Sequence, residues 1–307
     1  MADISRAEVA TLIQEAYAND LLAAAKEGST VLQAFPTVSM GTKTTHMPVL
    51  ATLPEAGWVS ESATAAGGVK PSSEVTWEDR TLVAEEIAVI IPVHENVVDD
   101  ATEAILTEIA QLGGQAIGKK LDQAVIFGTD KPASWVSPAL LPSATAASQT
   151  KTVSGVNANK DDLVGSVNQV AEQVALAGYQ PDTLLSSLAL RYQVANLRDA
   201  NGNLVFRDES FAGFNTFFNR NGAWAPASAS VVIADSTRVR LGVRQDITVK
   251  FLDQATLGTG SSAINLAERD MVALRLKARY AYVLGNGATA AGSAKTPVGA
   301  VVPASGS

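Results

Sequence analysis

Residues 87–128 read IAVIIPVHENVVDDATEAILTEIAQLGGQAIGKKLDQAVIFG, and the change of pattern inside this stretch decides the fold. The first part, IAVIIPV, is a short apolar run of the kind that forms a strand. From Asn96 onward the apolar residues recur at helical spacing, which predicts a helix over residues 96–127 that is about 45 Å long. Gly128 is expected to end it. Its apolar residues form two rows, Ile105, Ile109, Leu112, Ala116 and Ile117, Leu121, Val125.

Upstream of this helix, residues 73–91 have the pattern of one extended limb. At about 3.3 Å per residue the limb spans roughly 60 Å, against the usual 17–20 Å of a strand. Residues 44–53 predict a partner strand, and residues 55–72 between the two are rich in Gly, Ala and Ser. The limb therefore either bends into two strands or returns from a long hairpin arm that leaves the body. Its apolar side chains share one face, namely Val75, Trp77, Val83, Ile87, Val89 and Ile91.

The rest of the chain alternates shorter helices and strands. Helices are expected over residues 159–177 and 188–197, the first with the apolar stripe Leu163, Val167, Val170 and Val174. Strands are expected over residues 183–186, 204–206, 230–234, 238–243, 247–252 and 271–284.

The two chain ends contrast in composition. Residues 5–27 predict an amphipathic helix, in which Ser5 and Glu8 form a capping box. Residues 285–307 carry Lys295 as their only charge and few large apolar groups, so something outside this segment is expected to hold it.

Composition excludes several classes of function. Hydrophobic residues make up 47% of the 307 positions and charged residues 18%, which excludes a disordered chain and suggests that much of the surface is covered. The absence of cysteine excludes disulfides, thiolate zinc sites, iron–sulfur clusters and cysteine nucleophiles. Lys and Arg number 23 against 31 Asp and Glu, a net charge of −8, so no basic stripe for gripping nucleic acid is expected. No signal peptide or membrane span is predicted, because charges interrupt the first ten residues.

No catalytic site, cofactor site or metal site emerges from the residues. The glycine-rich stretch 258–263 separates two predicted strands and is interpreted as a hairpin loop rather than a dinucleotide fingerprint. The two histidines, His46 and His94, lack partners at ligand spacing and are interpreted as structural. Carboxylates that are neighbours in a strand point to opposite faces, and those at helix starts act as caps, which accounts for the pairs Glu85-Glu86, Asp99-Asp100 and Asp161-Asp162. The tryptophans are interpreted as core or interface anchors, namely Trp58, Trp77, Trp135 and Trp224.

The order of these elements resembles the major capsid proteins of tailed bacteriophages that have the Hong Kong 97 fold. Residues 87–128 carry the strongest likeness, as the return limb of the extended E-loop followed by the spine helix. Further likeness lies in Lys70-Pro71, in Leu197-Arg198-Asp199 with Gly202 and Phe206, in residues 243–249, and in the strand around Arg275-Leu276. The resemblance spans most of residues 30–284.

The resemblance implies an α+β fold with five parts. These are an N-terminal helix and arm (1–42), an E-loop hairpin (43–92), a P-domain with the spine helix and long strands (93–130 and 247–284), an A-domain (131–246) and a C-terminal tail (285–307).

The implied function is structural: self-assembly into hexamers and pentamers of an icosahedral phage head around double-stranded DNA. Expected partners are the chain itself, a separate scaffolding protein, a portal, a decoration protein, and packaged DNA without sequence-specific binding; no membrane is expected. Many relatives carry an N-terminal scaffolding segment, for which a helix beginning at Ser5 leaves no room. The expected location is the virion, after assembly in the host bacterial cytoplasm. Two alternatives stay open: an encapsulin-like compartment shell that encloses cargo enzymes, and a small-molecule enzyme with an unusual hairpin.

Contacts between protomers are expected at Trp58, Lys70, Pro71, Trp77 and Asn265, and both chain ends are expected to tie neighbouring subunits together. Some relatives form a lysine–asparagine isopeptide bond, for which Lys70 matches the lysine and Asn265 lies within about one residue of the acceptor. The bond also needs a carboxylate in an apolar pocket, but the matching positions are Met271, Val272 and Ala273. We therefore expect no cross-link.

Overall fold

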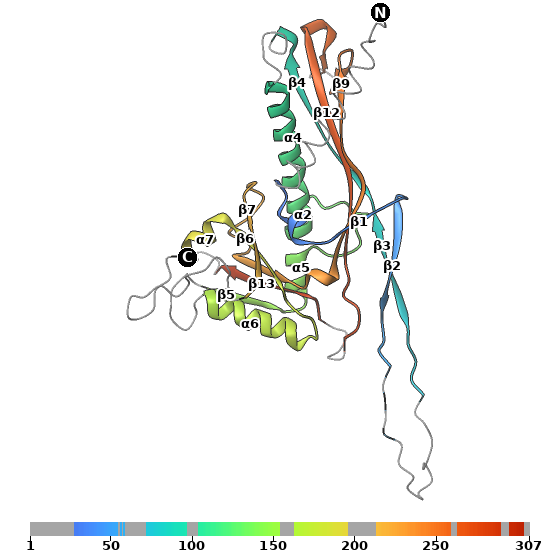
Figure 1. Ribbon diagram of the computed structural model, residues 1–307, viewed down its shortest axis with the longest axis vertical. Helices are drawn as coiled ribbons and strands as arrows, with labels where there is room; N and C mark the ends of the chain where they lie inside the picture. Colours follow the sequence, from blue (N-terminus) through green and yellow to red (C-terminus); the bar gives the residue numbers. More distant parts are fainter. Residues whose placement is uncertain are drawn as a thin grey trace, which may run out of the picture.

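The computed structural model describes residues 28–54, 56, 58, 72–96, 104–153, 163–195, 213–258, 263–289 and 295–303. The predicted helix at 5–27 and the predicted strand at 204–206 lie outside this part of the chain, as do Asp99-Asp100 and Asp161-Asp162. Figure 1 shows three regions: a tall unit with the long helix α4 beside long strands, a second sheet to one side, and a hairpin that points away from both.

The tall unit is a four-stranded sheet covered by α4. The strand order is β1 (Thr37–Ser39), β9 (Val239–Leu252), β12 (Met271–Leu284) and β4 (Glu85–His94). β12 is antiparallel to both of its neighbours. The strand predicted at 271–284 is confirmed, whereas those predicted at 238–243 and 247–252 are one continuous strand with an irregular register opposite Arg279.

The predicted spine helix is α4 (Ala104–Asp122), followed by a π-helical turn (Gln123–Phe127). Gly128 ends it with a φ of 76°, as expected. The row Ile117, Leu121, Val125 is buried, but Leu112 of the other predicted row is 57% exposed. The reason is that α4 turns Gly113 toward the sheet, where an added Cβ would lie 3.0 Å from the Leu276 side chain.

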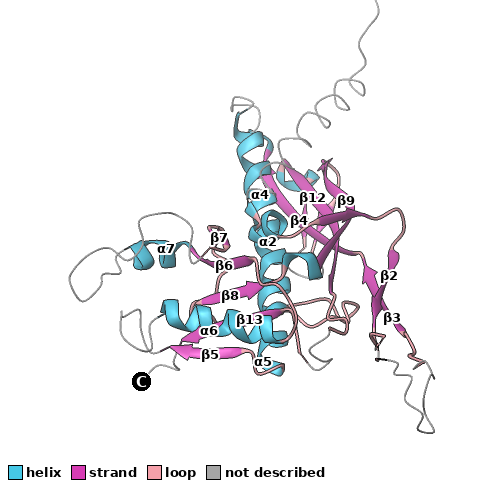
Figure 2. Ribbon diagram, turned by 60° about the horizontal axis from the view of Figure 1, so that its bottom comes forward, coloured by secondary structure: helices cyan, strands magenta, loops and turns pink. Residues whose placement is uncertain are grey.

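The second sheet has the order β5 (Thr150–Val153), β13 (Val298–Pro303), β8 (Val231–Ala234), β6 (Thr183–Ser187) and β7 (Asn215–Asn219). Helices α5 (Leu140–Ala146) and α6 (Leu163–Leu176) pack on it, and α7 (Leu188–Ala195) follows β6. Figure 2 shows α6 lying along β13 and β5. The predicted stripe of α6 is confirmed, since Leu163, Val167, Val170 and Val174 are all buried.

β13 corrects one expectation about the C-terminal segment. Residues 298–303 pair with both β5 and β8, and Val298, Ala300 and Val301 are fully buried. The expectation that a neighbouring subunit orders this segment is therefore wrong for β13, which lies inside its own chain's sheet. Small residues suffice there because Val298 and Ala300 pack in the cluster that contains α5, while Val301 packs in the cluster that contains α6.

Shorter elements complete the described fold. They are α2 (Thr30–Ala34), the hairpin of β10 (Thr256–Leu257) with β11 (Ile264–Asn265), and 3-10 turns at Ser236–Arg238 and Ala267–Arg269. The described parts of the glycine-rich stretch 258–263 lie between β10 and β11, as expected for a hairpin loop. Among the helices that the structure describes, none is long and apolar enough to cross a membrane.

Candidate assembly surfaces

The hairpin arm consists of β2 (Thr44–Leu50) and β3 (Trp77–Val83), paired antiparallel from Thr44↔Val83 to Leu50↔Trp77. At Ala84 the chain leaves β3 and enters β4, so both alternatives for the predicted limb hold: it bends into two strands, and the first of them is the return limb of an arm. The root of the arm is fixed to the body by a small buried cluster of Met40, Leu82, Ala84, Ala281 and Val283.

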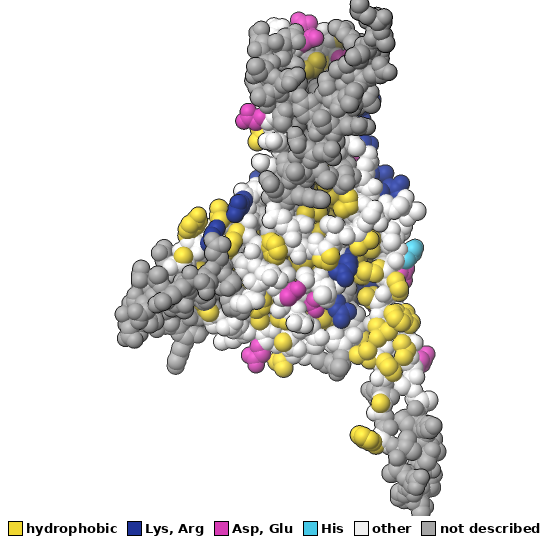
Figure 3. Space-filling view, in the orientation of Figure 1, with side chains coloured by type: hydrophobic (Ala, Val, Ile, Leu, Met, Phe, Trp, Pro, Cys, Tyr) yellow, Lys and Arg dark blue, Asp and Glu magenta, His cyan; other side chains and the backbone are white. Residues whose placement is uncertain are grey.

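Beyond its root, the arm exposes apolar side chains. Trp77 is 66% exposed and Trp58 is fully exposed, and Val75 and Leu53 are also open to solvent. Figure 3 shows hydrophobic side chains gathered over the arm near its junction with the body. Exposed tryptophans on an extended arm favour an interaction surface, because burying an aromatic side chain is a large part of interface energetics. The role of Trp58 and Trp77 between protomers stays a prediction.

The other predicted contact residues fall in different places. Lys70 and Pro71 lie outside the described residues. Asn265 lies in β11, opposite Thr256, and is half-buried. Residues 271–273 begin β12, where Ala273 is fully buried, and none of the three supplies a carboxylate.

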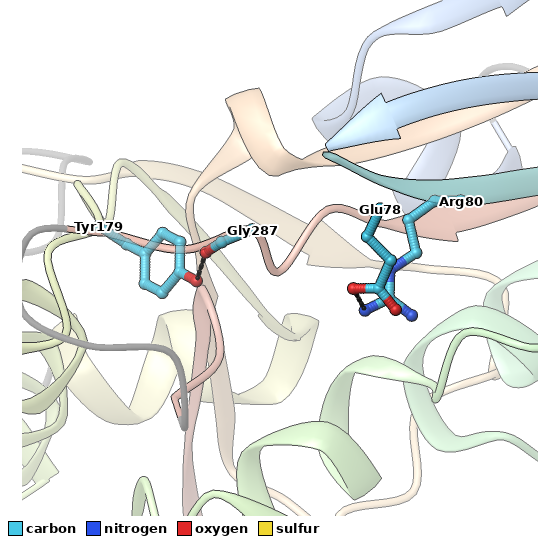
Figure 4. A network of polar contacts seen from close by, with 4 residues as sticks. All are labelled: Glu78, Arg80, Tyr179 and Gly287. Atoms are coloured by element: carbon cyan, nitrogen blue, oxygen red, sulfur yellow. Dashed lines mark hydrogen bonds and ion pairs between the residues drawn. The ribbon is translucent and has the colours of Figure 1, made fainter. Parts of the chain in front are cut away.

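Polar pairs run along the arm and its root. His46 Nδ1 lies 2.5 Å from an oxygen of Asp79 on the paired strand, and the interpretation of this histidine as structural stays a prediction. Arg80 donates to Glu78 at 3.0 Å on the same strand (Figure 4). These pairs are solvent-exposed and are worth at most about 1 kcal/mol each.

The end of β2 that lies away from the root also contacts the segment that follows β12. The Ala288 amide donates to the Leu50 carbonyl at 2.7 Å. Figure 4 shows the Tyr179 hydroxyl donating to the Gly287 carbonyl, at 2.8 Å. Residues 287–288 therefore bond to Leu50 at the end of β2 on one side and to the loop after α6 on the other.

The face of the β9–β12–β4 sheet that is turned away from α4 is basic. Leu274, Leu276 and Ala278 pack toward α4, so the residues that alternate with them occupy the opposite face. Lys250 stands opposite Arg275 in the register of β9. The described cations of this face are Lys250, Arg275, Lys277 and Arg279, and its one described carboxylate is Glu86, 3.7 Å from Lys277.

Two of these arginines each have a buried hydrogen-bond donor without an acceptor among the described residues. The Nε atoms of Arg275 and Arg279 are buried and have no hydrogen-bond partner among the described residues. Leaving a buried donor unpaired costs about 1–3 kcal/mol. The exposed neighbours on β4, Ala88, Ile90 and Pro92, leave the face open. The arrangement is suited to an anionic partner that supplies acceptors.

The arm carries the opposite charge. Residues 51–79 contain five acidic residues, Glu55, Glu61, Glu74, Glu78 and Asp79, and one basic residue, Lys70, which gives a net charge of −4. Glu74, Glu78 and Asp79 are exposed. An acidic arm and a basic sheet face on one chain are complementary between two copies of that chain.

The remaining candidates for chemistry have structural roles. The Trp135 and Trp224 indoles are buried and donate to the carbonyls of Val83 and Ala229. Glu85 lies 3.9 Å from Lys43 and Glu86 lies near Lys277, so these two carboxylates point to different partners. Within the described ranges no cluster of three metal-ligating side chains occurs.

Comparison with known proteins gives a consistent family. The model of the Phage capsid family matches residues 10–289. Among curated proteins, none matches the chain. A solved structure from Mycobacterium phage Cain is 75% identical over 100% of both chains, with a TM-score of 0.84.

Two further solved structures extend this likeness. One from Mycobacterium phage Adephagia is 74% identical over 98% of both chains, with a TM-score of 0.84. One from Microbacterium phage Oxtober96 is 38% identical over 90% of this chain and 91% of that chain, with a TM-score of 0.79. The capsid of an empty GTA particle, at 14% identity, 89% coverage of both chains and a TM-score of 0.60, shares the fold.

Proposed function

The chain belongs to the phage capsid family and is a major capsid protein of a tailed phage, and from this premise we propose that it self-assembles, arm onto sheet, into hexamers and pentamers of an icosahedral head. The family is that of phage capsids, so the compartment-shell alternative has no support from the comparisons.

The observation that carries the proposal is the charge complementarity between the arm and the sheet face. Residues 51–79 of the arm have a net charge of −4, whereas the sheet face has four described cations and one carboxylate, so the two surfaces attract each other. In one chain the arm points away from this face, while its root packs against Ala281 and Val283 at the face's lower end. In the proposed contact, a second copy supplies the arm that covers Arg275 and Arg279.

A charge swap tests the contact. The face variant Arg275→Glu/Arg279→Glu and the arm variant Glu74→Lys/Glu78→Lys each place like charges together, and each is expected to lower the yield of closed particles at least about tenfold. The variant with all four changes restores opposite charges and should recover most of that yield. Lys295→Glu, on an exposed residue of the second-sheet region, is the matched control for a reversed charge. Particles are counted by sedimentation and electron microscopy.

Two outcomes would contradict the proposed contact. One is normal assembly of the face variant with its subunit fold intact by circular dichroism. The other is a fourfold variant that assembles no better than the face variant alone.

The same proposal extends to the contents of the shell and to the other proteins that take part in its assembly. The head encloses double-stranded DNA without sequence-specific binding, and the net charge of −8 lets DNA move past the wall rather than adhere to it. A separate scaffolding protein and a portal act during assembly in the host cytoplasm, and a decoration protein is compatible with the outer surface. Mass spectrometry of purified particles, with their nucleic acid content, tests these partners together.

A further inference from the structure

Asp122 is a buried charge that the shell contacts do not use. It stands where α4 gives way to the π-helical turn, and it is fully buried. Its carboxylate accepts five hydrogen bonds from two distant segments. The donors are Ser29 Oγ at 2.7 Å, Thr30 N at 3.0 Å, Val31 N at 3.1 Å, Asn219 Nδ2 at 3.0 Å and Asn221 Nδ2 at 2.8 Å.

The first segment is the start of α2. The first amides of a helix have no partner inside the helix and need an acceptor. The Ser29 hydroxyl accepts from Leu32 N at 3.2 Å, while Asp122 takes the amides of Thr30 and Val31. One side chain on α4 thus completes the beginning of α2, about 90 positions earlier in the sequence.

The second segment is the end of the edge strand β7 and the turn that follows it. Asn219 donates to both Asp122 and Thr30 Oγ1, the latter at 2.9 Å. Asn221 donates to both Asp122 and the Gly28 carbonyl, and its own Oδ1 accepts from Ala223 N. The two asparagines therefore bond to the carboxylate and to residues 28–30 at the same time.

Backbone packing makes the junction close. An added Cβ at Gly118, one turn before Asp122, would lie 3.1 Å from the Gly28 carbonyl carbon and 3.2 Å from Ser29 Cβ. This close approach brings the chain at residue 28 onto α4.

A carboxylate suits the site better than an amide would. Burial raises the pKa of Asp122, while the bonds from Ser29, Val31, Thr30 and Asn221 lower it. All five recorded partners donate, so an amide at position 122 would turn its N–H groups toward at least one backbone N–H in either orientation.

We propose that Asp122 is a positioning residue for assembly, which fixes where the chain N-terminal to Gly28 leaves the body and makes that exit depend on the docking of residues 219–221 against the spine helix. The consequence for assembly rests on the proposed shell function, whereas the coupling itself is a property of one subunit.

The test uses unassembled full-length subunits and trypsin cleavage after Lys26, two residues before Gly28. Asn221→Ala removes a contact far away in the sequence, and it should raise the cleavage rate about tenfold, the factor that corresponds to about 1.4 kcal/mol of local opening free energy. Asp122→Asn should raise it at least as much.

Ser186→Ala is the matched control, because it removes a buried hydrogen bond to the Ser230 carbonyl in the same sheet without touching the junction. The control should leave cleavage after Lys26 within about twofold of the wild type, since local opening of one region need not open another. Particle yield is then measured for the same variants, and Asn221→Ala should lower it more than Ser186→Ala does.

Three outcomes would overturn the proposal: unchanged cleavage in Asn221→Ala, an equal acceleration by Ser186→Ala, or faster cleavage with undiminished particle yield. If Asp122→Asn does not fold, Asn221→Ala and Ser29→Ala carry the test. Failure of the wild type to form shells would defeat the proposed function but would leave the cleavage readout intact.

Discussion

The hairpin arm and the C-terminal strand β13 behave in opposite ways in the structure. For both segments the sequence analysis predicts contacts outside their own body. Trp77 on the arm is 66% exposed, whereas Val298, Ala300 and Val301 of β13 are fully buried between β5 and β8. A segment with large aromatic groups stays outside, and a segment of small residues completes a core.

The difference teaches that size and fit decide burial as much as hydrophobicity does. Gly299 lies so close to α6 that an added Cβ would be 2.3 Å from Val170 Cγ1 and 3.1 Å from Val174 Cγ2. Interiors are packed like crystals, so a strand between two helices can require glycine and alanine. In β13, therefore, the small residues reflect tight packing against α6 and do not indicate disorder.

Deleting part of each region should give the largest difference between β13 and the arm. Removing residues 295–307 takes away β13 and leaves β5 and β8 without their partner, so we expect a loss of more than about 5 kcal/mol in the free energy of unfolding, or an insoluble subunit. Removing residues 56–72 from the arm should leave a folded subunit that forms no closed particles. Circular dichroism melts and sedimentation measure both variants.

Two results would contradict this contrast between β13 and the arm. A C-terminally trimmed subunit that melts like the wild type would mean that β13 is dispensable to its sheet. Normal shells from the arm deletion would mean that the arm is not an assembly element.

The regular parts of the fold could be predicted from sequence because their patterns are local. Periodicity located α6 and its buried stripe, β12, and the long helix with Gly128 at its end. Periodicity missed the side of α4 that faces the sheet, because Gly113 rather than Leu112 meets Leu276 there.

The assembly surfaces were only partly accessible to the same reasoning. Exposed Trp58 and Trp77 could be singled out as aromatics in an extended arm. Of the basic face, the row Arg275, Lys277 and Arg279 follows from alternation along one predicted strand. Lys250 joins this row only through the register that places it opposite Arg275. The Asp122 junction likewise joins residues about 90 positions apart on either side, which no local pattern encodes.

Single glycines provide a sharper comparison of the two regions. Gly299→Ala must push Val170 or the strand aside, and we expect it to cost about 1–3 kcal/mol. At Gly41, beside the arm root, an added Cβ meets nothing within 4 Å, so Gly41→Ala should be neutral or stabilise by up to about 1 kcal/mol. Denaturant midpoints of the two variants give the contrast directly, and similar midpoints would refute the tight-packing explanation.

Trp77→Ala should change the free energy of unfolding by no more than about 0.5 kcal/mol, because the side chain is mostly exposed in one subunit. In a shell the same change should cost about 2 kcal/mol or more per contact if the arm is buried against a neighbour. Melting of isolated subunits and urea dissociation of particles separate the two effects. A large loss of subunit stability would place Trp77 among the core residues instead.

The smallest expected effect concerns a covalent bond from the arm of one copy to the β10–β11 hairpin of a neighbouring copy. A lysine with an ordinary pKa near 10.4 is protonated at neutral pH and is not a nucleophile, so an isopeptide bond from Lys70 to Asn265 needs a nearby carboxylate in an apolar pocket to take its proton. At the start of β12, Ala273 is fully buried but has no acid group, and the nearest carboxylates, Glu268 and Asp270, are exposed. The buried residue therefore has no carboxylate, and the carboxylates are not buried, so neither can act as the base that deprotonates the lysine. Boiled particles should therefore run as one band near 31.8 kDa on a denaturing gel, in wild type and Lys70→Ala alike. A ladder of covalent multimers that disappears in Lys70→Ala would show that a neighbouring subunit brings the missing carboxylate.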